Sequence, residues 1–376
     1  MKSNLLRASV QRVAYVDRLE RQLRRYRPQF QRAVRALALR HARMADLASS
    51  FPALLFALAV PRPGLDPARA IALAIEGVAL AEVSAAADVP MWLRRFPPEA
   101  LAGPLMKLPD GELFRQHIAN YLPRSPKLAP IWLQAVASAA ALAHHEFAVW
   151  VAREIVQEPK RFKVARPRRL CLWAWFSGQP GTCGQAMIAK PWMPAMRIAS
   201  AIDAADDWRV HVSLHVNLGR DPIADMWLRG GRLNGYDFVP LTTVNAICEE
   251  AAAMSNCLRT YGRSLAHNHC RLFSMRKDGR RVATLSVAAR SYDPLPNIVQ
   301  LSGPRNARVS KDEWWAARQW LNSHELPLIK IEDYKWDSAP LNRDAWVSLW
   351  RPYWLAKRRI PEWLPMAPSR AALKAL

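Results

Sequence analysis

One stretch decides the fold of the C-terminal half of the chain: residues 270–287, CRLFSMRKDGRRVATLSV. Two runs that alternate between apolar and polar residues flank Asp278 and Gly279. An Asp-Gly pair between two such runs is a strong β-hairpin signal. A third strand is expected at residues 297–301, after a proline-rich connection. Together these segments predict a small antiparallel sheet.

Helices are predicted on both sides of these strands. Thr242 or Thr243 can cap a helix that runs to about residue 258, because apolar residues recur there at spacings of three and four. Ser310 and Glu313 form a capping-box pattern at the start of a helix over residues 310–321. Helix, three antiparallel strands and helix make a compact α+β domain. We assign it to residues 236–325.

The rest of the chain is predicted to be mostly α-helical, which makes the fold class α+β with a helical N-terminal region and a Trp-rich helical tail. Residues 67–87 and 131–156 are each predicted to form one helix. Residues 209–216 alternate like a strand, which would place His211 and His215 on the same face. The predicted organisation is a basic amphipathic helical arm at 1–50, an α-helical domain at 51–169, a mixed connecting region at 170–235, the α+β domain at 236–325 and a Trp/Pro-rich extension at 326–376.

Trp346, Trp350 and Trp354 recur every four residues in that extension. Such a stripe can stack nucleobases, as in single-strand binding proteins, or it can pack against the Trp-rich helical domain. We favour packing, because large aromatic side chains at helical spacing usually belong to a core.

The chain is strongly basic: 54 Lys and Arg residues face 31 Asp and Glu residues, a formal charge of +23. This balance indicates a polyanionic partner, nucleic acid first and an acidic membrane surface or acidic protein second. Within the arm, Leu19, Leu23 and Tyr26 lie on one apolar stripe and arginines occupy the other faces. These basic faces could equally be solvated surfaces, and the basic run after residue 159 could be a linker. The predicted phosphate contacts are Arg18, Arg21, Arg24, Arg25, Arg27, Lys160, Arg161, Lys163, Arg166, Arg168 and Arg169.

The five cysteines are irregularly spaced and include no CxxC pair, so the sequence indicates neither a disulfide framework nor a zinc ribbon. The first residues lack the apolar core and cleavage site of a secretory signal, and no apolar run is long enough to span a bilayer. We therefore expect a cytoplasmic protein with no membrane span. No motif identifies a cofactor.

A set of short motifs resembles the PcfJ-like family. The motifs are the helix segment EAAAMSNCLRTY at 250–261, the strand ends FSMR at 273–276 and ATL at 283–285, and VQLSGPRN at 299–306. That family is encoded on conjugative plasmids, integrative elements and phages, so the resemblance implies a mobile-element context. This sequence departs from the family pattern at Ala251, where Gly is usual, and at Asn256, where His commonly precedes the cysteine. The second departure weakens any mechanism that needs a His-Cys dyad.

Five residues from the helix and strands of this domain are candidates for catalysis: Glu250, Cys257, Tyr261, Arg276 and Gln300. If they converge, Cys257 would act as the nucleophile, and Arg276 and Gln300 would stabilise developing negative charge. His267 or His269 in the following loop could assist. The alternatives are that Cys257 is a buried small hydrophobe and that Tyr261 and Gln300 belong to a structural polar network around Glu250.

A metal site is not predicted. His267, His269 and Cys270 lie close together in the sequence, but their spacing matches no standard zinc pattern and a fourth ligand is missing.

The sequence leaves two hypotheses for the function of the chain. In the first, the chain is a PcfJ-like accessory protein of a mobile genetic element that binds DNA or RNA through Arg-rich surfaces, in conjugation or in the processing or regulation of plasmid or phage DNA. A relaxosome or another nucleic-acid-bound protein would be a second partner. In the second, the PcfJ-like domain is an enzyme that uses Cys257 as nucleophile on a nucleic-acid-associated substrate. An open cleft lined by the five residues favours the enzyme, and a sealed cluster favours a scaffold.

Overall fold

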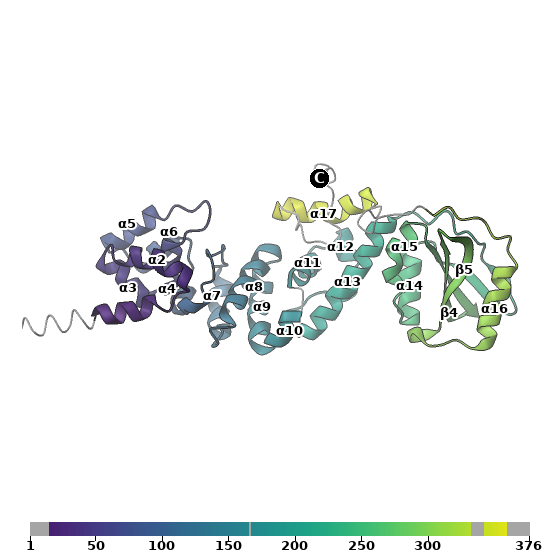
Figure 1. The fold of residues 1–376 in the computed structure, drawn as a ribbon, viewed down its shortest axis with the longest axis horizontal. Helices are drawn as coiled ribbons and strands as arrows, with labels where there is room; N and C mark the ends of the chain where they lie inside the picture. Colours follow the sequence, from purple (N-terminus) through teal and green to yellow (C-terminus); the bar gives the residue numbers. More distant parts are fainter. Residues whose placement is uncertain (1–14, 165–166, 332–341, 359–376) are drawn as a thin grey trace, which may run out of the picture. The chain divides into compact units, whose positions relative to one another are not determined.

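The computed structural model describes residues 15–164, 167–331 and 342–358 (Figure 1). It divides into two compact units. Unit 1 contains the chain up to Trp175 together with Pro191–Asp203, and unit 2 contains Phe176–Lys190 and the chain from Ala204 onward. Of the helices searched in the described ranges, none combines the length and apolarity needed to cross a membrane.

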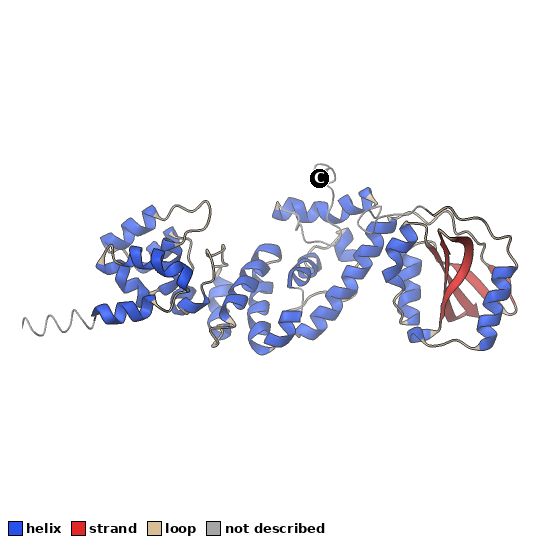
Figure 2. Ribbon diagram, viewed as in Figure 1, coloured by secondary structure: helices blue, strands red, loops and turns tan. Residues whose placement is uncertain are grey.

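Unit 1 is built from helices, as expected (Figure 2). Helix α4 is buried along almost its whole length, because its sequence PALLFALA carries no polar side chain. The Tyr26 hydroxyl donates to the Pro52 carbonyl at 2.9 Å, which ties the start of α4 to the arm. After the helix at 15–23, the α-helices are α2 Pro28–Ala38, α3 Ala42–Ser50, α4 Pro52–Ala59, α5 Ala68–Glu76, α6 Leu80–Ala86, α7 Glu112–Ile118, α8 Ala129–Leu142, α9 His145–Gln157, α10 Pro159–Val164 and α11 Pro167–Ser177, the last of which ends in unit 2.

Two long helices predicted in this region are each divided in two. The helix expected at 67–87 ends at Gly77, whose φ of +87° is a left-handed conformation that only glycine adopts without strain. The helix expected at 131–156 breaks at Ala143. There the ring of His144 accepts a hydrogen bond from the Phe147 amide at 3.2 Å and caps a new helix. Apolar periodicity continues across both breaks, and for this reason the sequence did not reveal them.

The strand predicted at residues 209–216 is wrong, because this segment lies inside α13, Ile198–Leu218. Its valines alternate with polar residues, which imitates a strand. Buried residues nevertheless recur at spacings of three and four along the whole segment, as one face of a helix requires. These buried residues are Ala201, Ala205, Trp208, Val212 and Val216.

Unit 2 contains one antiparallel sheet in the order β1-β2-β3-β4-β5. The three predicted strands are present, and the Asp278-Gly279 hairpin joins two of them. Two further strands precede them, joined by Asn234 and Gly235 with φ of +50° and +78°, as a tight hairpin turn requires. The strands are β1 Gly231–Leu233, β2 Tyr236–Pro240, β3 Cys270–Lys277, β4 Arg280–Arg290 and β5 Asp293–Ser302.

One face of this sheet is apolar and is covered by α16, Lys311–Asn322 (Figure 1). Trp320 of α16 stacks on Phe238 with ring centroids 4.6 Å apart and meets Phe273 edge-on at 4.9 Å. The capping box of Ser310 and Glu313 is present, as predicted. This side of the sheet forms one of the two apolar clusters of unit 2.

The opposite face carries polar residues beside a second apolar cluster, in which Leu272 of β3 packs with Ile247 and Leu265. Ser274, Thr284 and Ser286 follow the period of two along β3 and β4 and are all buried. Three helical elements lie on this side: α14 Val244–Met254, the 3₁₀ turn η4 Leu258–Tyr261 and α15 Gly262–Ala266. Thr243 caps α14 through a hydrogen bond from the Ala246 amide at 3.1 Å. Buried polar side chains between a sheet and its covering helices can line a pocket for a ligand.

The tryptophans of the C-terminal helix α17, Arg343–Lys357, take part in packing. Trp346 and Trp350 are buried, and Trp350 lies 5.8 Å from the ring of Phe176. Buried rings cannot stack nucleobases in this conformation. Trp346 and Trp350 are therefore packed, as expected, and Trp350 packs against Phe176 of α11.

Candidate functional site

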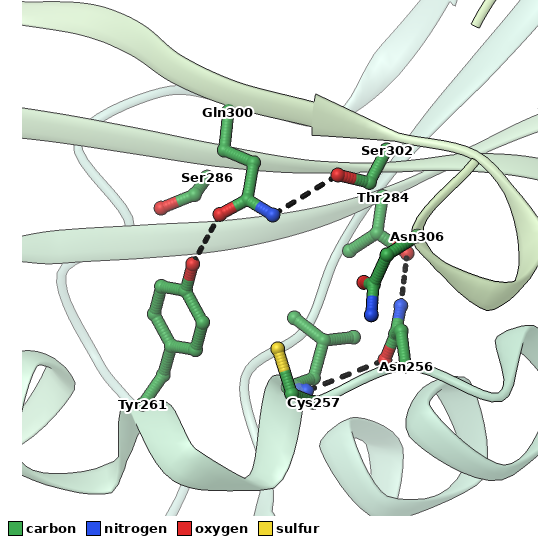
Figure 3. Close-up of a pocket in the computed structure, with 9 residues that line it drawn as sticks. Asn256, Cys257, Tyr261, Thr284, Ser286, Gln300, Ser302 and Asn306 are labelled. Carbon is green, nitrogen blue, oxygen red and sulfur yellow. Dashed lines mark hydrogen bonds between the residues drawn. The ribbon is translucent and has the colours of Figure 1, made fainter. Parts of the chain in front are cut away.

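A small pocket lies between η4 and the polar face of the sheet (Figure 3). Its volume is only about 10 Å³, enough for about one water molecule. None of its lining side chains is charged, and most carry a hydroxyl, amide or thiol group. The lining residues are Asn256, Cys257, Leu258, Tyr261, Thr284, Ser286, Gln300, Ser302 and Asn306.

Cys257 is exposed, and its sulfur points into this pocket (Figure 3). Its position follows from the end of α14, which stops at Met254 because Ser255 adopts the left-handed conformation at φ +50°. The continuous helix predicted to residue 258 is therefore wrong, and Tyr261 lies on η4. The alternative of a buried, small hydrophobic Cys257 is contradicted by its exposure.

Tyr261 and Gln300 form a hydrogen-bonded chain along one wall. The Tyr261 hydroxyl donates to Gln300 Oε1 at 2.5 Å, and Gln300 Nε2 donates to the Ser302 hydroxyl at 3.0 Å. Burial raises the pKa of Tyr261, while the neighbouring Ser286 hydroxyl acts weakly in the opposite direction. The phenol is therefore neutral near physiological pH and fixes the orientation of the Gln300 amide.

Glu250 lies behind the pocket and does not line it. Its carboxylate is fully buried and accepts hydrogen bonds from Thr284 Oγ1 at 3.1 Å and from Arg281 Nε at 2.7 Å. Thr284 Oγ1 in turn accepts from Asn256 Nδ2 at 3.3 Å, and Asn256 Oδ1 accepts from the Leu258 amide at 3.3 Å. This network holds the segment on both sides of Cys257, so Glu250 is placed to position the thiol and not to touch a ligand.

Arg276 is not among the pocket residues. It is half-buried on β3, and its Nε donates to the Ser274 hydroxyl at 3.2 Å. Of the five candidates, the structure therefore brings Cys257, Tyr261 and Gln300 together, places Glu250 behind them and leaves Arg276 outside.

Sequence reasoning missed part of this lining. Ser286 and Ser302 each lie two residues after a motif residue on the same strand, Thr284 and Gln300 respectively. The strand period of two could have identified both, because alternate residues share a face. Asn256, noted in the sequence only as a departure from the family pattern, also lines the pocket.

Ser286 is a buried polar residue in the pocket wall. Its side chain is 4 % exposed, and its hydroxyl lies beside the Tyr261 hydroxyl, whose pKa it lowers against the larger effect of burial. Ser286 therefore belongs to the polar wall that Tyr261 and Gln300 form.

The histidines do not complete a catalytic pair with Cys257. Neither His267 nor His269 lines the pocket, and burial lowers the pKa of His267. Among the described residues no group of three or more His, Cys, Asp or Glu side chains could hold a metal ion. A thiol and an imidazole do meet elsewhere in unit 2, where Cys183 Sγ lies 3.3 Å from His215 Nε2.

The arginines predicted to contact phosphate in the arm are all exposed. Arg25 forms an ion pair with Glu99 at 2.7 Å, and Arg21 Nε donates to the Asp17 carbonyl. Within the described residues, no carboxylate lies within ion-pair distance of the remaining three. We call these three the N-terminal arginine group: Arg18, Arg24 and Arg27.

The second predicted basic segment is less open. Lys160 is exposed, Arg161 pairs with Glu158 at 2.9 Å, and Arg169 is half-buried. Arg166 lies outside the described residues, as do the side chains of Lys163 and Arg168.

Comparison with known proteins supports the resemblance seen in the sequence. Residues 230–314 match the family model described as PcfJ-like protein. The matched segment runs from the start of the sheet into α16 and contains every residue of the pocket. No curated protein and no solved structure matches the chain.

Proposed function

We propose that this protein, which carries a PcfJ-like segment at residues 230–314, is an accessory factor of a mobile genetic element. In this proposal it binds nucleic acid through the arginine-rich surface of its N-terminal helices. The family resemblance supports the context, and the formal charge of +23 supports a polyanionic partner. The observation that carries the proposal is the N-terminal arginine group, which is exposed and has no described carboxylate partner.

Phosphate is the chemistry that this group fits. A guanidinium offers planar, fixed donors to phosphate oxygens and stays charged at all physiological pH values. An arginine that already pairs with a carboxylate must lose that partner before it binds phosphate, whereas Arg18, Arg24 and Arg27 have none to lose. The apolar side chains of Leu19, Leu23 and Tyr26 are buried on the opposite side of this segment, so the arm presents its basic side to solvent.

The test is fluorescence anisotropy with single-stranded DNA, duplex DNA and structured RNA at several salt concentrations. The variant R18A/R24A/R27A should bind more weakly than the natural chain. For duplex DNA, the slope of log affinity against log salt should fall by about two to three, since each phosphate contact contributes about 0.9.

A matched control separates contact from total charge. Lys107, Arg124 and Lys127 are exposed residues of the same unit and have no described ion pair. The variant K107A/R124A/K127A removes the same three charges and should keep most of the affinity. Equal losses in both variants would contradict a defined binding surface, and no binding of any polyanion by the natural chain would refute the proposal.

A second candidate function is covalent catalysis by Cys257 on a substrate that nucleic acid or a nucleic-acid-bound protein carries. It is favoured by the convergence of Cys257, Tyr261 and Gln300, three motif residues, on one open pocket. Iodoacetamide, with readout by peptide mass spectrometry, should label Cys257 first among the five cysteines. Preferential labelling of any other cysteine would contradict a reactive thiol at this site.

A further inference from the structure

A thiol and an imidazole meet outside the pocket, in the helical part of unit 2. Cys183 is the first residue of α12, Cys183–Ala186, and His215 lies near the end of α13. The Cys183 sulfur lies 3.3 Å from His215 Nε2, within hydrogen-bond reach of the ring. A nucleophile in hydrogen-bond contact with a base is the arrangement that thiol chemistry in proteins requires.

The fold holds α12 against α13, so this contact is fixed. The Trp208 indole on α13 donates to the Gly184 carbonyl at 2.9 Å. A Cβ at Gly184 would lie 2.4 Å from the Phe176 ring, so the backbone beside Cys183 packs directly on that ring. Both contacts keep the Cys183 sulfur within reach of the imidazole.

His215 is in the form that accepts a proton. It is 8 % exposed, and burial lowers the pKa of its imidazole; the charges of Arg220 and His211 act in the same direction. The ring is therefore neutral at physiological pH. With its own proton on Nδ1, it accepts a hydrogen bond from the thiol at Nε2 and can remove the thiol proton during a reaction.

The other four cysteines differ from Cys183 in their access to solvent or in the groups around them. Burial raises the pKa of Cys248 to about 11 and that of Cys270 to about 12, so both thiols keep their protons. Cys171 is buried. Cys257 is exposed, but none of the residues that line its pocket is a histidine or a carboxylate. Cys183 combines a half-buried position with a neighbouring base.

This combination suits hydrogen peroxide. The molecule is little larger than water, so it can reach a half-buried thiol that larger reagents reach poorly. Its reaction with a thiol needs a proton to move twice: the sulfur must lose a proton to attack, and the departing oxygen must gain one to leave as water. One imidazole beside the sulfur can carry that proton in both steps. Iodide, the leaving group of iodoacetamide, needs no proton, so alkylation gains less from the ring.

We propose that Cys183 is a site of oxidation by hydrogen peroxide, with His215 as the proton carrier. Nε2 takes the proton of the thiol, the sulfur forms a bond to one peroxide oxygen, and the oxygen–oxygen bond breaks. The departing oxygen receives the proton from Nε2 and leaves as water. The sulfur is oxidised to a sulfenic acid, and the peroxide is reduced. This inference depends on neither function proposed above.

The experiment treats the full, reduced chain with hydrogen peroxide in the presence of dimedone, which traps sulfenic acids. Peptide mass spectrometry over time follows each cysteine, and N-acetylcysteine in the same buffer gives the rate of a free thiol. Cys183 should be trapped first among the five cysteines and faster than the free thiol. Replacing His215 with Asn should slow its trapping by about 100-fold, the lower end of the effect of a general acid–base.

A neighbouring histidine of the same helix supplies the matched control. His211 lies one turn before His215, and its described contacts do not include Cys183. The H211N variant should leave the oxidation rate of Cys183 unchanged. Iodoacetamide gives a second readout, because H215N should slow alkylation of Cys183 much less than oxidation. Unfolding would expose the thiol and speed both reactions, so slower oxidation in H215N cannot result from loss of structure.

Two kinds of result would overturn the proposal. If another cysteine is trapped first, or if Cys183 is trapped no faster than N-acetylcysteine, Cys183 is not a site of peroxide oxidation. If H215N leaves oxidation unchanged, or slows oxidation and alkylation equally, His215 does not carry the proton. The order of iodoacetamide labelling, in which the exposed Cys257 is expected first, tests the second function separately.

Discussion

Replacing Glu250 with Gln tests whether the buried carboxylate positions the pocket. Glutamine keeps the shape and one carbonyl oxygen for Thr284, but it loses the charge that pairs with Arg281. A hydrogen bond to a charged group contributes about 1.5–3 kcal/mol. Arg281 is 32 % exposed and is therefore partly screened by water, which reduces the expected loss to about 1–2 kcal/mol of unfolding free energy.

The assay must report on unit 2 alone, because the 16 tryptophans make fluorescence a signal of the whole chain. Cys270 on β3 is buried, and burial raises its pKa to about 12, so it reacts with thiol reagents only when the sheet opens. Its labelling rate at increasing urea concentrations gives the stability of this unit. The E250Q variant should raise the population of the open state by about 5- to 30-fold.

A neighbouring residue supplies the control. Glu249 is exposed, and E249Q makes the same chemical change one residue away. That variant should change the free energy of unfolding by less than about 0.5 kcal/mol. R281A should destabilise more than E250Q, because it leaves a buried carboxylate unpaired, and the double variant should cost less than the sum of the two. Equal effects of E250Q and E249Q, or additive effects of E250Q and R281A, would refute the network.

Three further predictions concern the fold. Trp320→Ala should destabilise unit 2 by about 3–5 kcal/mol, because Trp320 is buried against Phe238, and the urea dependence of Cys270 labelling would show it. Burial lowers the pKa of His215 in the folded state below its ordinary value of about 6.5, so its stabilising contribution is complete above that pH and is lost as pH falls. The melting temperature of the natural chain should therefore fall more between neutral and mildly acidic pH than that of His215→Asn; a smaller fall would contradict the sign. Gly77→Ala should lower the melting temperature of unit 1, because φ there is +87° and the added Cβ would overlap the Arg43 side chain; an unchanged value would show that the turn rearranges freely.

Local signals in the sequence predicted the β3–β4 hairpin and the start of α16 in the α+β domain. The Asp278-Gly279 hairpin and the Ser310–Glu313 capping box depend on a few neighbouring residues, so they could be recognised without tertiary information. The β1–β2 hairpin was missed because β1 has only three residues, too few to show alternation. Its Asn234-Gly235 turn was the signal that could have identified it.

The candidate site could be predicted only in part, because which residues converge depends on how the sheet and the helices pack. The motif residues Cys257, Tyr261 and Gln300 do meet, although the helix expected to carry the first two ends at Met254. Glu250 and Arg276 are polar residues of the same segments, and nothing in their spacing indicates that one lies behind the pocket and the other outside it. Whether a side chain lines a cavity is a property of the packed state, and strand alternation restricts it only to a face.

The division of the sheet into an apolar face and a polar face affects how this segment can change over generations. Phe238, Phe273 and Trp320 hold the domain together on one side, while Ser286 and Gln300 line the pocket on the other. Exchanges at Gln300 and Ser302, which are half-buried pocket positions, remove little apolar contact and leave most of the folding energy intact. Selection can therefore change the shape and polarity of the pocket without changing the apolar clusters. A library of variants at Gln300 and Ser302 should still yield mostly folded protein.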